Sequence, residues 1–187
     1  MGEDDNCDVN SRDLVGARSH ANHGLPERMR IEFAPIGIIH SPFAELEGMP
    51  IQPPGGAAAK GTVEVFEAFR AGLKDLSGFS HIILLYYFHR SHSFNLHVVP
   101  FMDSELRGLF ATRAPKRPNP IGLSVVQLDK IEDDVLHIRN VDILDGTPLL
   151  DIKPYVPEFD TQVGVRTGWL EKARRSVSRR LSDNRFT

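Results

Sequence analysis

Hydrophobic and polar positions alternate along several short stretches of the chain, as expected of half-buried strands. The clearest alternation is TVEVF at residues 62–66. The segment IEFAPIGIIHSPF at 31–43 also has period-two character, and it ends at a Ser-Pro turn. In the segment HIILLYYFHRSH at 81–92, both odd and even positions are apolar through Phe88, which predicts a strand buried on both faces.

The remaining pattern predicts more strands than helices. We expect a strand in GLFATR, two strands in 121–144 about the acidic turn at 132–134, and a tight hairpin turn at Asp145-Gly146. Helical spacing predicts a short helix at 67–76 and another after Gly168. The Pro- and Gly-rich residues 48–61 are predicted to be loop.

These elements predict a mainly β protein, a small antiparallel or mixed β-barrel with a few short helices and a C-terminal helix. The strand–helix rhythm of a doubly wound nucleotide fold is missing from the sequence, as is G-x-G-x-x-G, which argues against a Rossmann domain. We expect a flexible acidic tail over 1–29, a barrel domain over 30–165 and a basic helix or tail over 166–187.

Composition narrows the function classes. A chain of 187 residues suits one domain, and a net charge of −3 argues against a nonspecific nucleic-acid coat protein while allowing a local basic patch. One cysteine excludes a disulfide framework or a thiolate metal site within one chain. The single cysteine also predicts a reducing, cytoplasmic setting. The acidic N-terminus and the short apolar runs predict neither a signal peptide nor a membrane span.

A rigid cationic loop is the strongest local signal. The stretch FATRAPKRPNPIGLS at 110–124 combines three prolines with Arg113, Lys116 and Arg117. Proline fixes φ, so the arginines would lose little entropy on gripping a carboxylate or phosphate with their paired donors. A strand connection with solvated cations is an equal interpretation of these residues alone.

The end of the apolar strand carries His89 and Arg90, and a strand end at a barrel rim is a natural place for ligand contacts. A metal site is not predicted from His89, His92 and His97, because no cysteine lies nearby and Ser and Asn separate them. The arginine-rich C-terminus is typical of an RNA-contacting helix and equally of a solvated or partner-binding face.

Four segments together resemble one family. They are FATRAPKRPNPIGLSVVQL, DILDGTPLLDIKPYVPEFD, GLKDLSGFSHIILLYYFH and PIGIIHSPF. The resemblance runs from about residue 31 to residue 160. The chain resembles the TsaA-like family, also called TrmO, with R-x-x-x-R-P-N-P-I-G as its most specific segment. The resemblance implies a small non-Rossmann β-barrel. It also implies a methyltransferase that uses S-adenosylmethionine to methylate N6 of threonylcarbamoyladenosine next to the tRNA anticodon.

The resemblance also implies homodimers with the cofactor site near the subunit interface, and it assigns residues. The implied catalytic residues are His89, Arg113, Arg117 and Asp145. The implied cofactor residues are Gln52, Pro53, His89, Arg90, Arg113, Leu123, Asp142, Leu144, Asp145, Gly146 and Thr147. Asp151, Lys153 and Tyr155 fit either a site or a structural role. The group that takes the proton of the nucleophilic nitrogen stays open: it is either the modified nucleoside's own carboxylate or a base of the chain, His89, Asp145 or His81.

Two other functions fit the same residues. One is a noncatalytic regulatory module that binds S-adenosylmethionine or RNA, and the other is a methyltransferase acting on a small molecule. Bacterial members of the family carry a further C-terminal domain, whereas this sequence stops soon after the expected barrel, which keeps the small-molecule alternative open. Expected partners are tRNA carrying threonylcarbamoyladenosine and a second copy of the chain, with no membrane and no metal.

Overall fold

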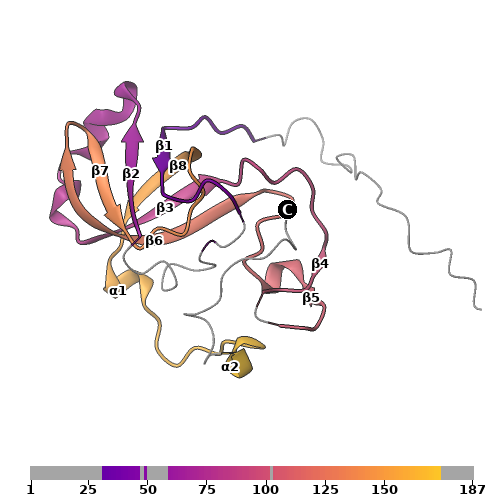
Figure 1. Ribbon diagram of the computed structural model, residues 1–187. Helices are drawn as coiled ribbons and strands as arrows, with labels where there is room; N and C mark the ends of the chain where they lie inside the picture. The colour runs from indigo at the N-terminus through magenta and orange to yellow at the C-terminus, as the bar shows by residue number, and fades with distance from the viewer. Residues whose placement is uncertain (1–30, 47–48, 50–58, 102, 174–187) are drawn as a thin grey trace, which may run out of the picture. The chain divides into compact units, whose positions relative to one another are not determined.

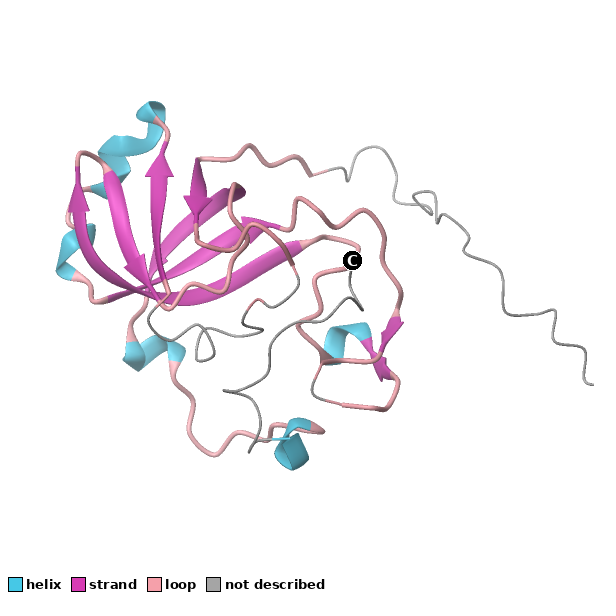
Figure 2. Ribbon diagram, in the orientation of Figure 1, coloured by secondary structure: helices cyan, strands magenta, loops and turns pink. Residues whose placement is uncertain are grey.

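The computed structural model describes residues 31–46, 49, 59–101 and 103–173. Contacts divide the chain into residues 1–32 and 33–187, and all the helices and strands described here lie in the second unit. Six strands form a closed barrel in the order β1-β2-β7-β6-β3-β8 (Figures 1 and 2). They are β1 Gly37–His40, β2 Lys60–Val65, β3 His81–Tyr87, β6 Ile121–Glu132, β7 Val135–Arg139 and β8 Thr147–Pro154.

Every pairing around this barrel is antiparallel, so each end of the barrel collects alternate strand starts and strand ends. At one end β1, β3 and β7 finish while β2, β6 and β8 begin. We call it the site end, because the segments that follow or precede those strand termini carry most of the residues assigned above. The loops at 40–43, 88–91, 112–120 and 140–147 all meet there.

The barrel interior is filled by alternate side chains from every strand. The buried core includes Ile39, Val63, Leu84, Val126 and Leu149. Burying a large aliphatic side chain stabilises a fold by about 1.5–3 kcal/mol, so this period-two pattern determines which face of each strand points inward. Ser124 and Thr147 are the buried polar residues among those that the structure describes.

The remaining elements lie between the barrel strands or after them. The short strands β4 (His97–Val98) and β5 (Arg107–Gly108) form a separate two-stranded sheet. Three 3₁₀ helices are η3 Glu67–Leu73, η4 Leu76–Gly78 and η5 Leu109–Ala111. Two short α-helices follow the barrel, α1 Pro157–Asp160 and α2 Leu170–Ala173.

The predicted barrel and the strands at 62–66, at 81–88 and on both sides of the 132–134 turn are confirmed. The prediction that the strand at 81–88 is buried on both faces is wrong, because its side chains alternate between the core and the outer face, where Tyr87 is 40% exposed. The start of the loop prediction at 48–61 lies largely outside the described residues, but Lys60 and Gly61 already belong to β2. The extended segment at 31–43 forms a strand only at Gly37–His40. The expected tail at 1–29 lies outside the described residues, as does most of the basic C-terminus.

Three local predictions are corrected. The GLFATR strand is limited to Arg107–Gly108, because the amide of Thr112 donates to the carbonyl of Leu109 at 3.0 Å and closes a 3₁₀ turn. The helix at 67–76 is 3₁₀ and divides into η3 and η4. Asp145-Gly146 is not a hairpin turn, because β7 pairs with β2 and β6 whereas β8 pairs with β1 and β3.

Candidate functional site at one end of the barrel

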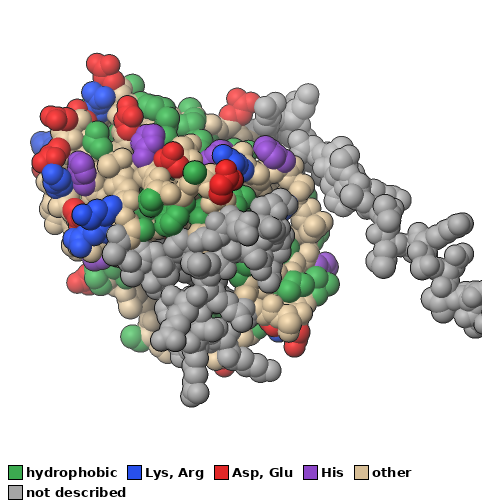
Figure 3. Space-filling view, viewed as in Figure 1, with side chains coloured by type: hydrophobic (Ala, Val, Ile, Leu, Met, Phe, Trp, Pro, Cys, Tyr) green, Lys and Arg blue, Asp and Glu red, His purple; other side chains and the backbone are tan. Residues whose placement is uncertain are grey.

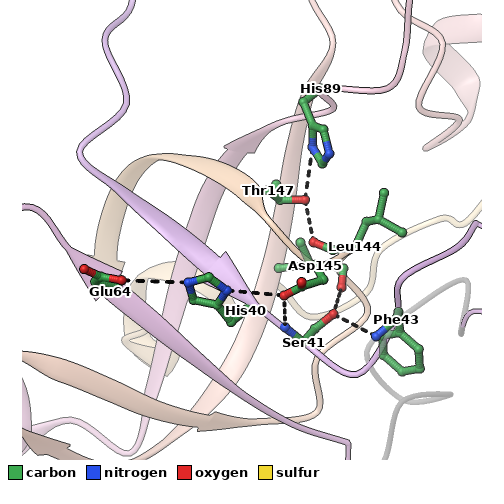
Figure 4. Close-up of polar contacts among 9 residues, drawn as sticks. His40, Ser41, Phe43, Glu64, His89, Leu144, Asp145 and Thr147 are labelled. Carbon is green, nitrogen blue, oxygen red and sulfur yellow. Dashed lines mark hydrogen bonds and ion pairs between the residues drawn. The ribbon is translucent and has the colours of Figure 1, made fainter.

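The turn that contains Asp145 is bonded to the segment after β1 (Figure 4). The amide of Ser41 donates to Oδ1 of Asp145 at 3.0 Å, and the Ser41 hydroxyl donates to the carbonyl of Ile143 at 2.6 Å. The amide of Asp145 in turn donates to the carbonyl of Phe43 at 2.8 Å. The tight turn predicted at Asp145 is therefore an anchored connection between β7 and β8, with its carboxylate held at the rim.

His40 lies between two carboxylates, that of Asp145 at this rim and that of Glu64 further along β2. Its Nδ1 is 3.3 Å from Oδ1 of Asp145, and its Nε2 is 3.9 Å from Oε2 of Glu64. The bond from the Ser41 amide, together with His40, holds the pKa of Asp145 below its usual range. Asp145 is therefore a stable anion at neutral pH, and its side chain is 48% exposed. In Figure 3, acidic, basic and histidine side chains lie close to one another on the face that is shown.

A second set of contacts links β8 to the loop after β3. Oγ1 of Thr147 donates to the carbonyl of Leu144 at 2.6 Å and lies 3.4 Å from Nδ1 of His89 (Figure 4). Partial burial and the neighbouring positive charge of Arg90 lower the pKa of His89. His89 is therefore a neutral imidazole at neutral pH.

A buried chain of hydroxyl groups leads to Asp142. The Tyr86 hydroxyl is 3.0 Å from Oγ of Ser124, which donates to Oδ1 of Asp142 at 2.7 Å. Because the Ser124 hydrogen is used on Asp142, the Tyr86 hydroxyl must donate to Ser124. Gly122 faces Tyr86 across the β3–β6 pair, and a Cβ there would collide with the tyrosine ring. Glycine thus leaves room for the ring beside Ser124.

Asp142 has an unusual proton affinity for a carboxyl group. Burial raises its pKa to about 6, although the bond from Ser124 and the charge of Arg113 act in the opposite direction. Burial likewise raises the pKa of Tyr86 well above its usual range. A carboxyl group that titrates near neutral pH at a barrel mouth is a candidate functional group.

The proline loop at 112–120 is braced by its own backbone and by the β3 loop. Nη1 of Arg117 donates to the carbonyls of Thr112 and Ala114 at 3.0 and 3.3 Å, and its guanidinium lies 5.8 Å from the centre of the Phe110 ring. The amide of Phe88 donates to the carbonyl of Pro120 at 2.8 Å. Arg117 therefore holds the shape of the loop in this structure.

Arg113 comes from the same loop and its side chain is exposed. Its charge lowers the pKa of both Asp142 and Tyr86, so the guanidinium lies near the site end. Arg90 is also exposed and lies 3.7 Å from the carboxylate of Glu45. The structure therefore gathers His89, Arg113, Asp142 and Asp145 around one barrel end.

Other predicted residues lie differently. Leu144 and Thr147 are buried beside the turn, while Gly146 has a φ of 72° and open space around a would-be Cβ. Leu123 is 49% exposed on the outer face of β6. Gln52 and Pro53 lie outside the described residues.

The other residues that were possible site groups lie in the middle of the barrel or at its opposite end. His81 starts β3 at the opposite end, where Nδ1 bonds the Ser80 hydroxyl at 3.0 Å. The amide of Tyr155 donates to the carbonyl of His81 at 3.1 Å, which places the tyrosine at the same far end. Asp151 and Lys153 form an ion pair of 2.7 Å on β8. These contacts are structural.

Sequence reasoning missed four residues of this site: His40, Ser41, Tyr86 and Ser124. Tyr86 and Ser124 occupy inward positions of strands, and their place in the sequence pattern does not distinguish them from ordinary core residues. The Ser-Pro turn at the end of the first segment is the sequence feature that marks His40 and Ser41. The neighbouring residues do not indicate that this turn bonds another turn about 100 residues later.

Three further observations concern metals, cavities and membranes. Among the described residues, no three His, Cys, Asp or Glu side chains are placed to hold a metal ion. A cavity of about 460 Å³ lies at the β4–β5 region, lined among others by Asn95, Asp103 and Lys116, and none of the assigned site residues lines it. Within the described chain, no helix is both long and apolar enough to cross a bilayer.

The site end therefore offers a rigid cation, a fixed anion, a neutral imidazole and a titratable carboxyl group. This set suits a zwitterionic ligand together with a proton transfer. A model of the tRNA-methyltransferase O N-terminal domain matches residues 38–161. The chain belongs to the TrmO family. This match covers all of the barrel except Gly37, the first residue of β1, together with the proline loop and the Asp145 turn.

Relatives of the TrmO family bear out this assignment. A probable S-adenosyl-L-methionine-binding protein of Pyrococcus abyssi is 57% identical over 84% of this chain and 86% of its own length. A tRNA (adenine(37)-N6)-methyltransferase of Mus musculus is 37% identical over 68% of this chain and 31% of its own length. The crystal structure of TrmO from Pseudomonas aeruginosa is 41% identical, with a TM-score of 0.64, and the match covers 75% of this chain and 63% of that one.

Proposed function

We propose that this TrmO-family protein is an S-adenosylmethionine-dependent methyltransferase that methylates N6 of threonylcarbamoyladenosine beside the tRNA anticodon. The observation that carries the proposal is the meeting of Arg113, Asp145 and His89 at one barrel end. The names of the mouse and Pyrococcus relatives support the reaction and the donor. The threonylcarbamoyl form of the base follows from the family resemblance of the sequence.

The residues at the site end fit this methyl donor. Its amino-acid end carries an ammonium and a carboxylate, for which Asp145 and Arg113 supply opposite charges. Gly146 leaves open space beside the turn, so a ligand can approach its backbone closely. When bound, S-adenosylmethionine supplies an electrophilic methyl group on a positively charged sulfur.

The chain's own residues then orient the reactants. We propose that Arg113 binds a carboxylate, either of the donor or of the threonyl group on the acceptor, while Arg117 and the prolines keep the loop in shape. Holding two reactants in line contributes up to roughly 7–11 kcal/mol to lowering a barrier. A loop that loses little entropy on binding suits this task.

We also propose that the protein acts in the cytoplasm as a homodimer. An apolar patch on the outside of the barrel supports the dimer: Tyr87, Ile121 and Leu123 are 40%, 40% and 49% exposed. Tyr87 pairs with Ile121 across β3 and β6, and Leu123 is two residues further along β6, so all three point outward from the same sheet face.

A methyl-transfer assay tests the reaction. Purified protein is incubated with isotopically labelled S-adenosylmethionine and tRNA that does or does not carry threonylcarbamoyladenosine, and the nucleosides are analysed by mass spectrometry. We expect label only on threonylcarbamoyladenosine. Arg113→Ala should lower kcat/KM roughly 10–100-fold, the loss of one charge-assisted interaction.

Arg70→Ala is the matched control. Arg70 is bonded to Val65 and Asp134 at the opposite barrel end, so its loss should leave kcat/KM unchanged. A protein that binds the donor but labels no tRNA would instead be a regulatory module, and labelling of a small acceptor alone would contradict the tRNA substrate.

A further inference from the structure

The site end contains several groups able to accept a proton, and their contacts distinguish among them. We infer that His89 is the catalytic base, accepting the proton of the nucleophilic nitrogen at Nε2, and that Thr147 is the positioning residue that fixes its tautomer. This inference rests on the proposed methyl transfer and deepens it by assigning the proton acceptor.

The tautomer of His89 follows from the single hydrogen of the Thr147 hydroxyl. A threonine hydroxyl has a single hydrogen, and the carbonyl of Leu144, 2.6 Å away, can only accept it. Oγ1 of Thr147 is then an acceptor toward His89, so Nδ1 of the neutral ring, 3.4 Å away, carries the hydrogen. The lone pair of the imidazole is consequently on Nε2, and among the described residues the ring makes no bond through that nitrogen (Figure 4).

The other candidates are less suited. His81 lies at the opposite end of the barrel and is bonded to Ser80. Asp145 is a weak base, because the Ser41 amide and His40 hold its pKa below the usual range. Asp142 is the strongest competitor, but its Oδ1 accepts the hydroxyl of Ser124, which is 1% exposed, so that oxygen points into the barrel.

The proposed step balances as follows. The N6–carbon bond forms while the carbon–sulfur bond breaks with its electron pair going to sulfur, and the N6 proton passes to Nε2 of His89. Burial and Arg90 lower the pKa of His89, which keeps the ring ready to accept a proton at neutral pH. Among the described residues, the other ionisable side chains at or near the site end include Arg113, Arg117, Asp142 and Asp145. Glu45 forms an ion pair with Arg90, and His40 contacts both Asp145 and Glu64.

The first experiment measures methyl transfer in single turnover at saturating donor and modified tRNA. His89→Gln should lower the rate roughly 100-fold or more, as expected for loss of a general base, and should remove the acid limb of the pH–rate profile. Asp142→Asn should retain that limb. Calorimetric titration with S-adenosylmethionine accompanies each variant, so that weakened binding is distinguished from lost proton transfer.

The second experiment tests the tautomer directly, without any reaction. In the ¹⁵N spectrum of the wild-type protein we expect His89 to carry its hydrogen on Nδ1. Thr147→Val removes the hydroxyl and should mix the tautomers and slow transfer roughly tenfold, about the contribution of one neutral hydrogen bond. Thr147→Ser keeps the hydroxyl and should therefore have the wild-type tautomer of His89 and the wild-type rate of methyl transfer.

The outcomes separate the two claims. A wild-type rate in His89→Gln, or a wild-type hydrogen on Nε2, overturns the role of His89 while leaving the methyltransferase proposal intact. Unchanged tautomer and rate in Thr147→Val overturn the positioning role. A wild-type protein that methylates no tRNA contradicts the proposed function, and this inference with it.

Discussion

At the scale of single residues, Asp142 is held in a place that does not suit a charged carboxylate. Ser124 and Tyr86 provide a chain of two hydroxyl groups, yet burial still raises the pKa of Asp142 to about 6. The ionised form is therefore less favourable in the folded protein than in the unfolded chain. A residue kept at such a cost to stability is typical of a functional site.

This gives a prediction about stability and pH. Because the pKa of Asp142 rises from its ordinary 3.8 to about 6 on folding, its contribution to stability is present below pH 3.8 and is lost as the pH rises through 6. Asp142→Asn removes this loss and keeps an acceptor for Ser124. At pH 8 the variant should be more stable than the wild type by about 3 kcal/mol, with little gain near pH 4. Urea unfolding across this pH range measures the difference.

Asp129→Asn is the matched control, and it should have the opposite sign. Nε of Arg139 donates a shared hydrogen bond to Oδ1 and Oδ2 of Asp129, at 2.8 and 2.7 Å, which lowers the pKa of this carboxyl group. Its stabilising contribution is present above its unfolded pKa and is lost as the pH falls through the lower folded value, so the substitution should destabilise the protein at pH 8. An Asp142→Asn variant that is equally less stable would contradict the account of Asp142.

At the scale of elements, strands β3 and β6 do two things at once. Their inward side chains, Tyr86 and Ser124 among them, build the polar chain to Asp142, while Tyr87, Ile121 and Leu123 form the exposed apolar patch. Contiguous apolar surface of this kind is typical of an interface. A twofold interface brings the same patch of both subunits together.

The patch predicts the effect of a single charge. Leu123→Glu should place two like charges in a dimer interface and convert the protein to a monomer, as measured by sedimentation equilibrium. Phe159→Glu is the matched control, because Phe159 is 77% exposed on α1 and not on the patch. A monomeric wild-type protein, or a dimeric Leu123→Glu variant, would show that this patch is not a dimer interface.

The elements also show what could be predicted from the sequence. Alternation predicted β2, since a strand with one buried face has a period of two, whereas β3 was predicted from a continuous apolar run. The pattern on either side of the acidic turn predicted β6 and β7. The sequence pattern failed for GLFATR, where the Thr112 hydroxyl and amide both bond the carbonyl of Leu109 and favour a 3₁₀ turn. It also failed for the Asp145 turn, because a local Asp-Gly signal does not say which strands will pair.

At the scale of the whole molecule, the closed antiparallel barrel explains why distant segments share one site. An even number of alternating strands brings three strand ends and three strand starts to the same rim. The chemistry of the proline loop and of the Asp145 turn, together with the family resemblance, predicts that both belong to the site, and the barrel brings both to that rim. The register that joins Ser41 to Asp145, and the bond that sets the tautomer of His89, depend on tertiary pairing and have no local signal.

The most direct test of the central claim is a crystal structure of the protein with S-adenosylhomocysteine, the demethylated product of the donor. We predict electron density for the ligand at the barrel end formed by Arg113, Asp145 and Thr147. The sulfur atom of the ligand should lie at this same end, near Nε2 of His89. Density at the opposite end beside His81, or in the cavity beside Asn95 and Lys116, with the predicted end empty, would contradict this account.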